Sequence, residues 1–133
     1  MIWEALVDSP LSELQIVGAV TALLPVVAAE VLVVADVTGA PAGAGIRVLC
    51  EGRSQRGQFP FRLSLYLRDE ALWIHHERQF FQGVCATLYC ACLLSDGSPS
   101  PHSMLLLQDP GRTSRVWLDP DLLDDDRCVL LRP

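Results

Sequence analysis

Five aspartates form the densest group of chemically capable side chains in this 133-residue sequence. They fall within eight residues near its end, and they are Asp119, Asp121, Asp124, Asp125 and Asp126. A calcium loop needs alternating oxygen ligands, a glycine at the bend and a distal glutamate, whereas this segment is interrupted by proline and leucine. Two main interpretations stay open. Asp119 or Asp121 caps a short helical segment in a solvated turn, or the aspartates form an acidic surface that speeds association with a basic partner.

A second polar set lies on a predicted strand. In FPFRLSLYLR (59–68), apolar and polar residues alternate, which is typical of a strand whose sheet is covered on one face. Arg62, Tyr66 and Arg68 fall on the polar side. Such a face could bind carboxylate or phosphate groups of a partner through arginine, or it is a solvated face that discourages aggregation.

The five cysteines are interpreted as reduced core thiols, because their number is odd and no secretory signal is visible. A helix predicted over 77–94 carries three of them, Cys85, Cys90 and Cys92. On that helix Cys85 and Cys92 lie about 10 Å apart along the axis, and Cys90 and Cys92 point about 200° apart. We therefore expect neither a disulfide nor a metal site here. The adjacent His75 and His76 also lack the spacing of zinc ligands.

No catalytic motif is present. The sequence has no G-x-S-x-G elbow, and without lysine it has no phosphate-binding P-loop. The glycine-rich TGAPAGAG (38–45) precedes a predicted strand, whereas a dinucleotide loop opens a helix. We expect a protein that is not an enzyme and has no cofactor.

Periodicity and turn residues predict the elements that position these groups. The expected helices begin at Ser9-Pro10 and at Glu77, with Leu14, Val17 and Val20 among the apolar positions of the first. The expected strands cover 30–37, 45–51, 59–68, 103–108, 115–118 and 128–131. The order α-β-β-β-α-β-β, with a short edge strand after it, predicts an α+β fold with a single antiparallel or mixed sheet and two main helices, in one globular domain over 1–133.

Composition limits the classes of partner. The net charge of −6 argues against nucleic acid, whose phosphates need a basic surface. Proline and two carboxylates interrupt the most apolar stretch (16–37), which argues against a membrane span. We expect a cytoplasmic protein.

The C-terminal half resembles small immunity proteins of bacterial polymorphic-toxin systems. The likeness lies in CLLSDGSPSPHSMLLLQDPG followed by RVWLDPDLLDDD, in which a helix end, a Ser-Asp turn and two strands lead to an acidic Leu-Asp segment, and it spans about residues 59–131. It implies a non-enzymatic inhibitor that binds a cognate toxin domain encoded by a neighbouring gene and blocks its active site. We expect a monomer rather than a dimer. The aspartates, with Arg62, Tyr66 and Arg68, are the expected contact residues.

The alternative is a secretion chaperone of the type III class, which is also small and acidic and whose order of elements is similar. A chaperone is expected to be a homodimer that binds an unfolded effector, whereas an immunity protein binds a folded toxin.

Overall fold

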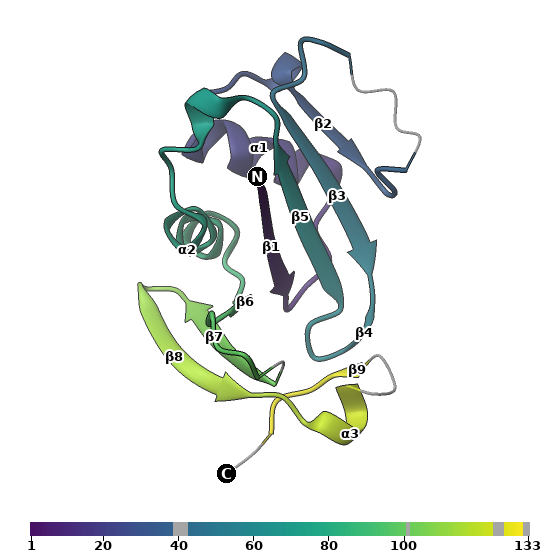
Figure 1. The fold of residues 1–133 in the computed structure, drawn as a ribbon, viewed down its shortest axis with the longest axis vertical. Helices are drawn as coiled ribbons and strands as arrows, with labels where there is room; N and C mark the ends of the chain where they lie inside the picture. The colour runs from purple at the N-terminus through teal and green to yellow at the C-terminus, as the bar shows by residue number, and fades with distance from the viewer. Residues whose placement is uncertain (39–42, 101, 124–126, 132–133) are drawn as a thin grey trace.

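A seven-stranded sheet in the order β2-β3-β5-β1-β6-β7-β8 organises the chain in the computed structural model (Figure 1). The structure describes residues 1–38, 43–100, 102–123 and 127–131, so part of the predicted glycine-rich loop (39–42) lies outside the described residues. The strands are β1 (Ile2–Val7), β2 (Val31–Val34), β3 (Val48–Ser54), β5 (Phe61–Leu67), β6 (Cys92–Ser95), β7 (Ser103–Gln108) and β8 (Arg112–Trp117). β2 is parallel to β3, and the other neighbours are antiparallel.

Two main helices, α1 (Glu13–Leu23) and α2 (Glu77–Leu88), pack against this sheet. α1 buries Ile16, Ala19 and Val20, and α2 buries an aromatic and aliphatic stripe that includes Phe81 and Val84. These side chains share one core with inward-facing residues of the central strands. The predicted α+β class, with one mixed sheet and two main helices, is confirmed. Two short 3-10 helices lie in the connections: η1 (Ala28–Glu30) directly precedes β2, and η2 (Glu70–Leu72) lies between β5 and α2.

The start of the first helix differs from the prediction. Residues before Asp8 form β1, which lies in the middle of the sheet between β5 and β6. The helix begins after Ser12 rather than at Ser9-Pro10, because Ser12 and Gln15 form a capping box. Ser12 Oγ accepts the Gln15 N–H at 3.1 Å, and Gln15 Oε1 accepts the Ser12 N–H at 2.9 Å. Leu14, expected on the apolar face, is 85% exposed.

The end of the second helix also differs. The helix predicted over 77–94 stops at Leu88, and Tyr89 adopts a left-handed conformation with φ 52° and ψ 52°. The chain then enters β6, which pairs with β1 on one side and β7 on the other. Apolar residues continue past Leu88 at helical spacing, which favoured a longer helix. The run CLL (92–94) also suits a buried strand, and pairing with β1 and β7 makes it one.

A smaller apolar cluster lies apart from the main core. It consists of Leu6, Phe59, Leu93 and Leu118, with residues of β7 and β8 packed against it. The C-terminal segment includes α3 (Pro120–Leu123) and β9 (Arg127–Cys128), and both lie near the turn that contains β4 (Arg56–Gly57) (Figure 1). β9 pairs with β4 in a second sheet, and Leu118 bridges to Leu130. A short strand is therefore present near the predicted range 128–131, but it covers Arg127–Cys128 and belongs to the second sheet, and the Leu118–Leu130 bridge joins this segment to the end of β8.

Candidate functional site

A groove of about 550 Å³ opens where the first half of β1 separates from β6 and β7. β6 pairs with β1 only at Leu6 and Val7, so within the part of the chain that the structure describes the residues before Leu6 have no strand partner on that side. Leu6 lies opposite Arg62 on β5 and opposite Leu93 on β6, and all three line the groove. Met104 and Leu118 add further apolar surface. The groove thus has an apolar floor supplied by the smaller cluster.

Two carboxylates line the groove beside one arginine. Glu77, the first residue of α2, accepts the backbone N–H of Glu4 at 3.0 Å through Oε2. The Oε1 atom of Glu4 lies 3.7 Å from Nε of Arg62, and Oε2 accepts a hydrogen bond from buried Ser64 at 3.3 Å. Burial raises the pKa of Glu77; the Glu4 N–H opposes this rise, and the Glu4 carboxylate adds to it. These two acids against one arginine leave the groove with an excess of negative charge.

The opposite wall is rich in serine. Ser95, Ser98, Ser100 and Ser103 all line the groove. Two of them bind Asp96: the Ser98 N–H donates at 2.9 Å, and the Ser103 hydroxyl donates to Oδ2. The hydrogen bond from Ser103, followed by that from the Ser98 N–H, lowers the pKa of Asp96 to about 2. Asp96 is therefore a carboxylate at neutral pH and holds the serine wall in place.

The predicted residues on β5 do not converge on one site. Arg62 lines the groove, and Tyr66 lies opposite Ile2 on the same pair of strands. Arg68 follows the end of the strand, where Nη1 donates to the Gly43 carbonyl at 3.0 Å. Six residues of extended chain separate Arg62 from Arg68, a distance of about 20 Å. Both arginines are exposed, but at this separation one phosphate or carboxylate group cannot contact both.

The two described aspartates of the acidic segment have different roles. Asp119 Oδ1 accepts the N–H groups of Asp121 at 3.0 Å and Leu122 at 3.4 Å, so the capping interpretation is confirmed for Asp119. Asp121 is exposed on α3. The segment follows Leu118 directly, which brings it to the edge of the groove. Asp124, Asp125 and Asp126 lie outside the described residues.

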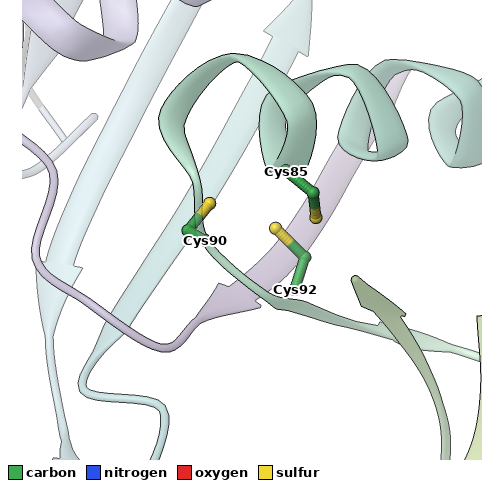
Figure 2. A group of neighbouring side chains, drawn as sticks. All are labelled: Cys85, Cys90 and Cys92. Carbon is green, nitrogen blue, oxygen red and sulfur yellow. The ribbon is translucent and has the colours of Figure 1, made fainter. Parts of the chain in front are cut away.

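Three cysteines that were expected to lie apart on one helix form a cluster. The Sγ atoms of Cys85, Cys90 and Cys92 all lie within 4.8 Å of one another, gathered below the end of α2 (Figure 2). The expected separation along one helix is wrong, because the helix ends before Cys90. Cys90 and Cys92 stand two residues apart on a chain that enters a strand, so both point to the same side. The spacing C-x4-C-x-C was visible in the sequence, but its geometry depends on the left-handed turn at Tyr89.

The three clustered cysteines and Cys50 differ in their surroundings. Cys85, Cys90 and Cys92 are buried, as is Cys50 on β3, and all four are free thiols. Burial alone raises the pKa of Cys50 to about 12. In the cluster, hydrogen bonds from Cys90 and Cys92 lower the pKa of Cys85, while the same contacts with Cys85 raise those of the other two.

The sequence patterns did not identify Glu4 and Glu77 as groove residues, because these two acids meet only when β1 enters the sheet.

In the described ranges, no helix combines the length and the apolar character needed to cross a bilayer. No family model, curated protein or solved structure matches this chain.

Proposed function

We propose that this chain is a non-enzymatic immunity protein that binds a cognate toxin domain in the bacterial cytoplasm and occludes its active site. The observation that supports this most is the groove, about 550 Å³ in volume and lined by Glu4, Glu77 and Arg62. It is large enough for one long side chain or a loop tip of a partner. Leu118 lines the groove and Asp119 follows it directly, so the start of the acidic segment lies next to the groove.

The chemistry of the groove suits a basic side chain of the toxin. Its two carboxylates can pair with a guanidinium group, and Leu6, Leu93 and Leu118 can pack against the aliphatic part of that side chain. The net charge of −6 favours approach of a basic surface. Interfaces commonly depend on a few anchors of this kind, and arginine is among the most frequent.

The groove is held by hydrogen bonds before any partner arrives. Ser64 binds the Glu4 side chain, and Glu77 binds the Glu4 backbone. Asp96 fixes the serine wall. A surface ordered in advance loses little conformational entropy on binding, which favours tight inhibition. The chaperone alternative rested on small size, acidic composition and the order of elements. The chain departs from that order, because β1 precedes α1 and lies in the centre of the sheet.

The test is to express the C-terminal domain of the neighbouring gene product in a bacterial host, alone and with this chain. We expect arrested growth that the chain relieves, and a one-to-one complex of the purified proteins. Glu4→Arg should weaken binding roughly 30-fold, the equivalent of about 2 kcal/mol for a disrupted charge pair at an interface. Glu70→Arg, a charge reversal at an exposed site on η2, is the matched control.

The two possible failures distinguish an error in the proposed function from an error in the proposed binding surface. A chain that neither binds nor protects would refute the immunity function. Protection that survives Glu4→Arg as fully as Glu70→Arg would show that the toxin binds elsewhere on the molecule.

A further inference from the structure

Three buried sulfur atoms converge from three places in the fold. Cys85 lies in the last turn of α2, Cys90 follows the left-handed Tyr89, and Cys92 is the first residue of β6. Their Sγ atoms lie within 4.8 Å of one another, and the residues are 0%, 6% and 0% exposed. Cys50 is also buried but belongs to no such group among the residues that the structure describes.

From this geometry we propose that Cys85, Cys90 and Cys92 bind one thiophilic metal ion of the d10 class, Cu(I) or Zn(II). With metal–sulfur bonds of about 2.3 Å, sulfur atoms around one ion lie about 3.8 Å apart in a tetrahedral site and about 4.0 Å apart in a trigonal plane. Sulfurs within 4.8 Å need to close by less than about 1 Å to reach that arrangement. A change of rotamer or a small backbone shift supplies this.

The ligands are held by the backbone around them. The Cys90 N–H donates to the Cys85 carbonyl at 3.3 Å, so the chain turns back beneath the helix end. Asp8 locks Ala91 from both sides: Asp8 Oδ1 accepts the Ala91 N–H at 2.9 Å, and the Asp8 N–H donates to the Ala91 carbonyl at 3.1 Å. Cys92 pairs with Val7 and Leu107 in the sheet. Such a framework fixes the ligand positions before the ion binds.

The type and number of ligands select the ion. All three are thiols, and within the described residues no imidazole or carboxylate belongs to the group. Thiolate ligands select Cu(I) and Zn(II) over calcium or magnesium. Zinc in structural sites is almost always four-coordinate, so three sulfurs in a buried site favour Cu(I) in a trigonal arrangement.

Binding replaces S–H bonds with S–metal bonds, and the released protons pass to the buffer. The ion would then join the end of α2 to β6, the point at which the chain changes from helix to strand. Cys90 is the only one of the three ligands with measurable exposure, so it marks the side from which an ion enters. This inference is independent of the proposed function.

The experiment uses the whole reduced chain in the absence of oxygen. Cu(I) is titrated in competition with a colorimetric Cu(I) chelator, and Zn(II) in a parallel arm with a chromogenic zinc indicator. We expect one equivalent to bind in at least one arm and to raise the melting temperature, because the ion binds the native state. Cys85→Ser, Cys90→Ser and Cys92→Ser should each lose tight binding, whereas the matched control Cys50→Ser should keep it.

Folding of each variant is checked by circular dichroism. The melting temperature of the unaltered chain, with and without metal, tests the proposal without any variant. Tight binding in one arm supports the site and identifies the ion. The proposal is overturned if neither ion binds stoichiometrically, or if all three variants bind as tightly as the control. Mass spectrometry of the freshly purified chain gives a further check. A mass lower by two hydrogens, located in the peptide that contains these three cysteines, would show a disulfide instead and would also overturn the proposal.

Discussion

Ser103 Oγ donates a hydrogen bond to Oδ2 of Asp96 and so joins the first residue of β7 to the loop that follows β6. The same carboxyl group accepts the Ser98 N–H and lies 3.5 Å from Nε of Arg115 on β8. Its side chain is only 1% exposed. One buried carboxylate therefore organises the serine wall of the groove and ties it to the outer hairpin.

Asp96 should make the stability of the protein depend on acid pH. Its pKa is about 2 in the folded chain and about 3.9 in an unfolded one. Because the folded value is the lower one, the stabilisation is complete above about pH 4 and is lost as the pH falls toward about 2. Asp96→Asn should lower stability at neutral pH and remove this part of the acid dependence. Urea denaturation of both proteins across this range measures it, and curves that stay parallel would contradict the prediction.

Gly52→Ala should destabilise the sheet, because Phe61 fills the space beside Gly52. A methyl carbon at residue 52 would lie 2.6 Å from Cζ of Phe61, a ring that is buried and cannot move into solvent. Overpacking of this kind costs about 1–3 kcal/mol. Gly45→Ala, where nothing lies within 4 Å, is the control and should be neutral or slightly stabilising. Equal unfolding free energies for the two variants would refute the clash.

Cys92→Ser should cost more stability than Cys85→Ser in the metal-free chain. The thiol of Cys85 lies 3.4 Å from the Leu107 carbonyl oxygen, to which a serine hydroxyl could also donate. Among the described hydrogen bonds, no backbone acceptor serves Cys92, whose side chain is fully buried. A hydroxyl at residue 92 would have only the weak sulfur acceptors of Cys85 and Cys90 as partners, and an under-satisfied buried hydroxyl costs about 1–3 kcal/mol. Chemical denaturation of both variants under reducing conditions gives the comparison, and the reverse order would be decisive against it.

Tyr89→Gly should be more stable than Tyr89→Ala by about 1 kcal/mol. Residue 89 holds φ at 52°, where a Cβ atom is strained and glycine is not. Tyr89 is 86% exposed, so both variants lose the same small amount of packing. Thermal unfolding of the pair isolates the backbone contribution. No difference between them would mean that the turn relaxes out of the left-handed region.

Replacing Asp124, Asp125 and Asp126 by alanine should slow association with a cognate toxin and flatten its dependence on salt. The prediction rests on their charge, since long-range attraction raises association rates and salt screens it. Asp119→Ala should behave differently, because Asp119 caps α3 and its loss acts on folding. Stopped-flow measurements at two salt concentrations test this. Unchanged rates at both would return the three aspartates to a solvated turn.

Local patterns in the sequence were sufficient where one face of an element is buried and the other is not. The alternation in residues 59–68 predicted β5, and Phe61, Leu63 and Leu65 are buried while Arg62 is exposed. The strand predicted over 103–108 is β7, and the one predicted over 115–118 overlaps β8. Such signals act over a few residues, so they survive without knowledge of the rest of the fold.

Tertiary structure decided what depends on distant partners. β1 buries Ala5, Leu6 and Val7 in succession, because it lies in the middle of the sheet with both faces covered at that end, and this removes the alternation that would reveal a strand. Glu4 meets Ser64, 60 residues away, through pairing that no local pattern encodes. The groove and the cysteine cluster both depend on β1 and β6. The sequence determined the residue types and the solvated faces, and long-range pairing determined which side chains meet.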